Sequence, residues 1–252
     1  MTLSFLEFDK NIFVKLEDFA SSTATNLEII ETVRSILDQV NTRKDEAVLE
    51  KTKLYDKALL LAPDLLVSSE DLQSGFDSLT PDELVALESA RQNISDFHHQ
   101  SLPENWEGIN SHGAKYGEKY YPINRVGLYV PGGSVPLVST VLMTTTLAKV
   151  AKVPEIVVVT PPDSKGEISP KLLGAIKFSG VSEVYKVGGA QAIGALAYGT
   201  ESIPKVDKIF GPGNAYVNEA KRQVFGTVGV DLLPGPSEVM IIADETANPK
   251  FI

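Results

Sequence analysis

The 252-residue chain contains no cysteine, which excludes a disulfide framework, a thiolate zinc site and a cysteine nucleophile. No apolar run approaches the ~18 residues that a membrane-spanning helix needs. The first residues, Met1 to Glu7, lack a basic segment followed by an apolar one, so we see no secretory signal. Basic residues are also scarce, with 23 Lys and Arg against 33 Asp and Glu, a net charge of −10. We therefore expect a soluble, cytoplasmic protein that acts on small molecules and binds neither nucleic acid nor membrane.

Two familiar nucleotide-binding motifs are missing as well. The pattern G-x-x-x-x-G-K-[ST] is absent, and the nearest approach to G-x-G-x-x-G begins at Gly211 and has Tyr216 where the third glycine should be. Histidine is rare: His98 and His99 are adjacent on a predicted helix and point in different directions, and His112 stands alone. The residues thus show no helical metal pair and no acid–base dyad.

The composition changes near residue 125. Only four of the 19 glycines and four of the 15 prolines precede Val126. Apolar residues at three- and four-residue spacing predict an amphipathic helix over about residues 26–55. A second helix is predicted from Thr80, because Pro81 suits the first helical position and Glu83 completes a capping box. The first part therefore has the pattern of a helical packing arm.

The second part alternates β-branched apolar runs with helical stretches. The predicted strands are 125–130, 155–160, 183–187, 208–210, 228–232 and 238–243. The predicted helices lie near 136–151, 169–179, 190–198 and 214–225. This alternation is typical of parallel βαβ units, and it predicts an α/β fold with a doubly wound, Rossmann-like parallel sheet. Turns rich in glycine or proline follow most strands, and ligands of such sheets bind at the carboxyl ends of the strands.

Polar side chains on these turns are the candidate ligand contacts. Tyr129 ends the first predicted strand and offers a ring and a hydroxyl. Gln191 and Asn214 each carry a donor and an acceptor, which suits neutral ribose or amide groups. Ser237 follows Pro236 in a rigid turn, which suits a role in positioning a substrate group. Each of them equally suits a local hydrogen bond within its own turn.

Several stretches carry a resemblance to a known family. Among them are Gly188-Gly189-Ala190-Gln191, Gly211-Pro212-Gly213-Asn214 and Gly235-Pro236-Ser237-Glu238. Together with their surroundings they form six segments: 127–134, 139–143, 187–193, 198–214, 219–224 and 235–239. In this order they resemble histidinol dehydrogenase, whereas residues before Val126 are much less diagnostic. Pro234 departs from the family, which usually has alanine before Gly-Pro-Ser-Glu.

The resemblance implies an NAD-dependent, zinc-assisted oxidation of L-histidinol to L-histidine through histidinaldehyde, the last step of histidine biosynthesis. It implies that Tyr129, Gln191 and Asn214 contact NAD and that Ser237 contacts the substrate. It places the zinc ligands and a catalytic Glu-His pair after Ile252, so this chain itself is expected to hold no catalytic residue and no metal ligand. We expect an N-terminal portion of the enzyme, inactive alone, and a homodimer at full length.

Three regions are expected on this basis. Residues 1–125 form a helix-rich part of an incomplete second α/β domain, 126–238 a Rossmann-like NAD-binding domain, and 239–252 the start of the return into the first domain. The apolar faces of the first region are then expected to lack a partner within this chain. Two alternatives stay open: a short, non-catalytic nucleotide-binding protein, and a dehydrogenase of the same superfamily for another small polyol or amino alcohol.

Overall fold

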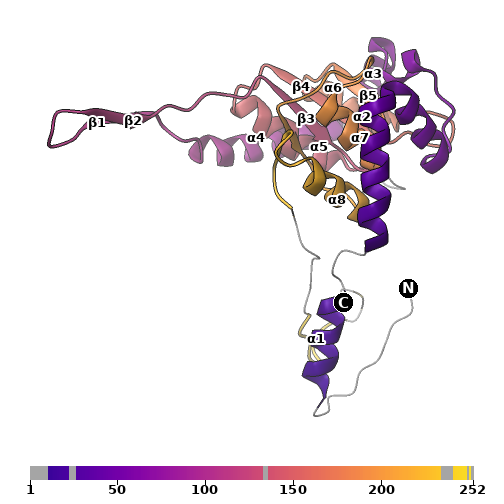
Figure 1. Ribbon diagram of the computed structural model, residues 1–252, viewed down its shortest axis with the longest axis horizontal. Helices are drawn as coiled ribbons and strands as arrows, with labels where there is room; N and C mark the ends of the chain where they lie inside the picture. Colours follow the sequence, from indigo (N-terminus) through magenta and orange to yellow (C-terminus); the bar gives the residue numbers. More distant parts are fainter. Residues whose placement is uncertain (1–10, 23–26, 133–135, 234–240, 249, 251–252) are drawn as a thin grey trace.

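A five-stranded parallel sheet occupies the centre of the computed structural model, which describes residues 11–22, 27–132, 136–233, 241–248 and 250 (Figure 1). The strands are β3 (Arg125–Tyr129), β4 (Glu155–Thr160), β5 (Glu183–Lys186), β6 (Lys208–Phe210) and β7 (Gly229–Val230). Their order, β5-β4-β3-β6-β7, is that of a Rossmann sheet counted from β3. The prediction of a doubly wound α/β fold is therefore confirmed, although β7 is shorter than the predicted 228–232.

Both faces of this sheet are buried because the strands are apolar on both sides. Val157 and Val159 belong to one hydrophobic cluster, and Ile156 and Val158 belong to the other. The helices that follow the strands are α5 (Val138–Val150), α6 (Pro170–Phe178), α7 (Gly189–Tyr198) and α8 (Ala215–Val224). Residues of α5 and α6 join the second cluster, and residues of α7 and α8 join the first. Each helix therefore covers the sheet face that its strands present.

The helices that precede the sheet pack onto it. They are α2 (Leu27–Tyr55), the 3₁₀ helix η1 (Ala62–Leu65), α3 (Ser69–Asp77) and α4 (Pro81–Gln100). Helix α2 lies against α7 and α8, α3 against α6, and α4 against α5. Val33, Leu37 and Val40 of α2 are buried in the same cluster as α7. The expectation that these apolar faces lack a partner within the chain is wrong, because the helices of the sheet supply one.

A kink in α2 is tied to the loop after α7. Lys44 interrupts the helix with φ 52°, so two helical segments meet there. Both Asp45 carboxylate oxygens accept hydrogen bonds from Ser202, at 2.5 Å from its hydroxyl and 3.3 Å from its backbone N–H. The Asp45 N–H donates to Glu201 at 3.1 Å. These bonds fasten the kink of α2 to the body that carries the sheet.

Two described parts extend away from the body (Figure 1). Strands β1 (Trp106–Ile109) and β2 (Lys115–Glu118) form an antiparallel hairpin whose side chains are largely exposed. Helix α1 (Ile12–Ser22) lies apart from the other helices.

Helix α4 begins with the predicted capping box, in which Thr80 and Glu83 bond reciprocally. None of the described helices is long and apolar enough to cross a membrane.

The last predicted strand, 238–243, is wrong where it is described. Residues 238–240 lie outside the described residues, and 241–243 belong to no strand. Ile242 is 90% exposed there, because no neighbouring strand buries it. The division of the chain into 1–125, 126–238 and 239–252 stays a prediction, to be weighed against the packing of α2, α3 and α4 on the sheet.

Candidate functional site

Three loops meet at the carboxyl edge of the sheet. They follow β3, β4 and β5. A glycine of the first loop and a glycine of the last both pack closely against Pro161 in the loop after β4. A Cβ added to Gly132 or Gly188 would lie only 2.5 or 2.4 Å from the Pro161 side chain. Such an approach admits no side chain at either position, so both glycines are required by packing. This edge is where a doubly wound sheet binds its ligand.

Tyr129 joins these loops to the one that follows β6. Its hydroxyl accepts a hydrogen bond from the Gly189 N–H at 3.1 Å. A Cβ on Gly211, where φ is +122°, would lie 2.1 Å from the Tyr129 carbonyl oxygen. The Tyr129 ring belongs to the hydrophobic core, and its hydroxyl can donate a proton as well as accept the Gly189 N–H. Burial raises the pKa of Tyr129, the Gly189 N–H lowers it, and the charge of Asp56 adds to the rise.

Gln191 lies in the first turn of α7 and is 1% exposed. Neither its Nε2 nor its Oε1 has a hydrogen-bond partner. Its Oε1 lies 2.7 Å from where a Cβ of Gly189 would stand, and Gly189 has φ +63°. A buried amide with both ends unpaired costs about 1–3 kcal/mol for each unpaired group, so it calls for an explanation. A ligand with one donor and one acceptor at the start of α7 supplies that explanation.

Asn214 caps helix α8. Its Oδ1 accepts a hydrogen bond from the Val217 N–H at 3.1 Å, which is the local use that its position in a turn allows. The residue is exposed, and its amide NH₂ is left as the group to meet a ligand. Ser237, the fourth predicted contact, lies outside the described residues. The structure thus brings Tyr129 and Gln191 together at Gly189 and places Asn214 on the neighbouring loop.

A buried ion pair holds the loop after β6. Lys221 is 1% exposed, pairs with Asp231 and donates a hydrogen bond to the Gly211 carbonyl at 3.0 Å. Asp231 accepts the Gly211 N–H at 2.9 Å. The sequence predicts no role for Lys221, which here joins the loop after β6 to helix α8. Its one sign in the sequence is a lysine on the otherwise apolar face of a helix.

Sequence reasoning also missed a cavity of about 540 Å³ between the ends of β3 and β4. Asp56, from the segment after α2, and Thr160, the last residue of β4, line it together with Gly132. The Asp56 Oδ2 and the Thr160 Oγ1 are buried and have no hydrogen-bond partner. Burial raises the pKa of Asp56 to about 6. No local sequence pattern around Asp56 predicts that it lines this cavity, because its place depends on how α2 packs.

Unpaired polar atoms concentrate at this edge. Seven buried side-chain atoms in the described part of the chain have no partner, and four of them belong to Asp56, Thr160 and Gln191. Buried polar groups are normally hydrogen-bonded, and exceptions mark functional sites or bound molecules. The carboxyl edge is therefore the candidate functional site.

A metal site is a separate question. Within the ranges that the structure describes, no group of three or more His, Asp or Glu side chains comes together to hold a metal ion. His98 and His99 lie at the end of α4, and His112 lies in the turn of the β1–β2 hairpin. These histidines are remote in the chain from the loops of the carboxyl edge. The described residues do not fit a zinc ion.

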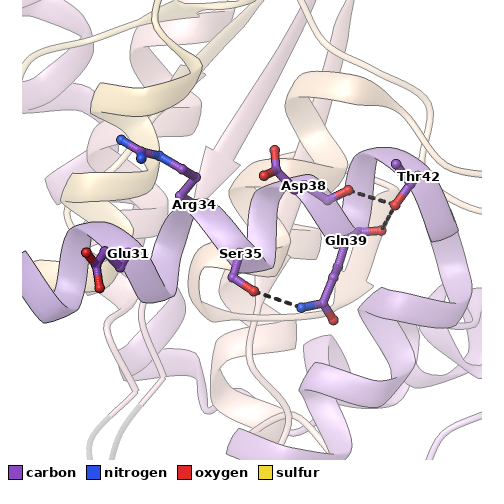
Figure 2. A pocket seen from close by; sticks show the side chains of 6 residues that line it. All are labelled: Glu31, Arg34, Ser35, Asp38, Gln39 and Thr42. Atoms are coloured by element: carbon purple, nitrogen blue, oxygen red, sulfur yellow. Dashed lines mark hydrogen bonds between the residues drawn. The ribbon is translucent and has the colours of Figure 1, made fainter.

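Another hollow, of about 390 Å³, lies along the outer face of α2. Figure 2 shows its six side chains, all on this one helix: Glu31, Arg34, Ser35, Asp38, Gln39 and Thr42. Gln39 donates to the Ser35 hydroxyl at 3.0 Å, and the Thr42 hydroxyl donates to the Asp38 carbonyl at 2.8 Å. The polar groups here are mostly exposed and bond within the helix, which is typical of a solvated helix face.

Comparison with known proteins gives a consistent result. A family model described as histidinol dehydrogenase matches residues 20–252. Histidinol dehydrogenase 2 of Trichormus variabilis is 50% identical over 221 residues, which are 88% of this chain and 51% of that protein. The Streptococcus mutans enzyme is 45% identical over 90% of this chain and 52% of its own length. The crystal structure of histidinol dehydrogenase from Elizabethkingia anophelis is 40% identical, with a TM-score of 0.81 over 90% of this chain and 52% of that one. The chain spans about half the length of these relatives.

Proposed function

The chain belongs to the histidinol dehydrogenase family, and on this premise we propose that it provides the NAD-binding part of an enzyme that oxidises L-histidinol to L-histidine through histidinaldehyde. This is the last step of histidine biosynthesis. The zinc ligands and the Glu-His pair of that reaction are proposed to lie outside these 252 residues. A cytoplasmic location and a full-length homodimer are part of the same proposal.

The unpaired amide of Gln191 supports NAD binding most directly. It lies in the first turn of α7, where the N-terminal end of the helix favours a negatively charged group. Gly188 and Gly189 precede Gln191 and carry no side chain that would stand between this helix end and a ligand, and Gly189 adopts a positive φ of +63°. A dinucleotide supplies both kinds of partner, a charged pyrophosphate and neutral hydroxyl or amide groups. The residues present therefore fit NAD.

The roles proposed for the chain's own residues follow from their bonds. Gln191 donates to and accepts from the cofactor, Tyr129 fixes Gly189 and offers its hydroxyl proton, and Asn214 presents its amide NH₂. Ser237 is proposed to contact the substrate. NAD, when bound, supplies the hydride acceptor. Because the described residues do not fit zinc, none of these roles involves that metal.

Calorimetric titration of the 252-residue chain with NAD tests the proposal. We expect saturable binding that Gln191→Met lowers at least about tenfold, because the apolar side chain fills the same space without hydrogen bonds. Gln92→Met is the matched control, since the Gln92 amide lies exposed on α4 and donates to Asp96 at 2.6 Å. Absence of NAD binding by the folded chain, or equal affinity of all three proteins, would contradict the proposal.

A further inference from the structure

The end of β4 lacks the acidic residue that a Rossmann sheet usually provides there. In that fold, an Asp or Glu at the end of the second strand hydrogen-bonds the 2′-hydroxyl of the adenosine ribose. The corresponding strand here is β4, since it lies beside β3 on the side away from β6. It ends at Thr160 and is followed by Pro161 and Pro162. The first acid after them, Asp163, accepts the N–H groups of Lys165 and Glu167 at 2.8 and 2.9 Å. Its Oδ1 is therefore engaged in its own turn.

A carboxylate from another part of the chain occupies the cavity at this strand end. Asp56 follows α2 directly and lines the cavity with Thr160 and Gly132. Its backbone N–H bonds the Thr52 carbonyl at 2.9 Å, so the residue continues the last turn of α2. Its Oδ2 and the Thr160 Oγ1 are both buried without a partner. Two residues with an unpaired buried oxygen, one a carboxylate and one a hydroxyl, thus line the same cavity of about 540 Å³.

The charge of this cavity favours neutral hydroxyl groups over phosphate. Asp163 and Glu167 line the same cavity, so its titratable lining residues are all acidic in the part of the chain that the structure describes. Hydrogen bonds from its own turn hold the pKa of Asp163 below its usual value, which keeps that residue ionised at neutral pH. A phosphate group placed here would be repelled, whereas a ribose diol donates its protons to carboxylate.

From these observations we propose that Asp56 accepts a hydrogen bond from the 2′-hydroxyl of the adenosine ribose, in the cavity that Thr160 also lines, and that this carboxylate makes the site prefer NAD to NADP. The proposal rests on the proposed function, because it names a contact of the same dinucleotide. Asp56 takes the role of the acid missing from the end of β4, although it belongs to the helical region that precedes the sheet. The packing of α2 on α7 and α8 then contributes directly to cofactor binding.

The test is a thermodynamic cycle on the 252-residue chain, with calorimetry as the readout. The ligands are NAD, its 2′-deoxyadenosine analogue and NADP, and the proteins are the unaltered chain, Asp56→Asn and the control Asp38→Asn. Asp38 is an exposed carboxylate on α2, the helix that precedes Asp56, and it lines the hollow of Figure 2. Circular dichroism establishes that each variant is folded, and Asp56→Ser serves as a second variant should Asp56→Asn fail to fold.

We expect Asp56→Asn to weaken NAD binding about tenfold and to leave the affinity for the 2′-deoxy analogue nearly unchanged. The loss of affinity from removing the carboxylate and the loss from removing the 2′-hydroxyl are then not additive. The ratio of NADP to NAD dissociation constants should fall at least about fivefold in Asp56→Asn and stay constant in Asp38→Asn. If the chain binds NAD but Asp56→Asn alters neither ratio, the role of Asp56 is refuted while the proposed function stands. If the folded chain binds no NAD, both are refuted.

Discussion

The two edges of the parallel sheet differ in how fully their buried polar groups are paired. At the amino edge, the terminal nitrogens of Arg125 bond Glu155 at 2.6 Å and Glu183, its backbone N–H donates to Asp207 at 2.9 Å, and its Nε alone is buried without a partner among its nitrogens. At the carboxyl edge, four buried polar atoms of Asp56, Thr160 and Gln191 have no hydrogen-bond partner. The first edge uses its polar groups for stability. The second keeps them for a ligand, at a cost in stability.

The loops of the carboxyl edge are nevertheless tightly packed. Substitution of Gly211 should destabilise the chain most. We expect Gly211→Ala to lower the free energy of unfolding by about 4 kcal/mol, because the new Cβ would meet the Tyr129 carbonyl at 2.1 Å in addition to the strain of φ +122°. Gly226→Ala is the control, with φ +96° but nothing within 4 Å, and should cost about 1 kcal/mol. Urea denaturation measures both, and equal losses would refute the close approach.

Removal of the buried cation beneath the same loop comes next in size. Lys221→Met leaves Asp231 without its ionic partner and the Gly211 carbonyl without a donor, so we expect a loss of about 3 kcal/mol. The double variant with Asp231→Asn should recover part of this loss, since no unpaired charge then remains. Urea denaturation of the single and double variants decides between them. A double variant less stable than Lys221→Met would contradict an ion pair at this place.

The amino edge should respond differently. Arg125→Met removes the bonds to Glu155 and Glu183, and we expect a loss of about 2 kcal/mol in unfolding free energy. The affinity for NAD should not change, because this edge lies at the opposite end of the strands. Calorimetry and urea denaturation on the same variant give both numbers. A marked fall in NAD affinity of the folded variant would contradict the view that the amino edge contributes to stability and not to NAD binding.

The smallest effect has the opposite sign. Burial raises the pKa of Asp56 to about 6 in the folded chain, above the value of an exposed carboxyl, so the folded state binds this proton more tightly. Its contribution to stability therefore falls as the pH rises from about 4 to 6 and stays lower above that. Asp56→Asn removes the charge and should stabilise the chain by about 1 kcal/mol at pH 8, a value discounted because the residue is only partly buried.

Thermal unfolding of Asp56→Asn and the unaltered chain at pH 4 and pH 8 checks this sign. The gain should be present at pH 8 and nearly absent at pH 4. A variant that is less stable at pH 8 would show that Asp56 serves the fold rather than a ligand.

Periodicity and turn chemistry predicted most of the sheet and its helices. The β-branched runs place β3, β4 and β5 within a residue or two, and Thr80 and Glu83 mark the start of α4 through a capping box. These signals are local, since each depends on neighbours in the chain. The glycines at 188, 189 and 211 likewise point to loops of close approach before any contact is known.

Long-range packing was beyond the sequence. An amphipathic α2 shows which of its faces is apolar but not that α7 and α8 receive it. For the same reason the sequence around Asp56 does not show that it lines a cavity with Thr160, and the sequence around Lys221 does not show its bond to Gly211. The strand predicted at 238–243 failed at 241–243 because an apolar run forms a strand only where a partner strand meets it.

Hydrogen–deuterium exchange of the 252-residue chain with and without NAD tests the central claim, that the carboxyl edge of the sheet is the cofactor site. NAD should slow exchange in the stretches 188–191 and 211–214 and around Asp56, and should leave the β1–β2 hairpin and the amino edge near Arg125 unchanged. Protection confined to the hairpin, to the outer face of α2 or to the amino edge would contradict the account.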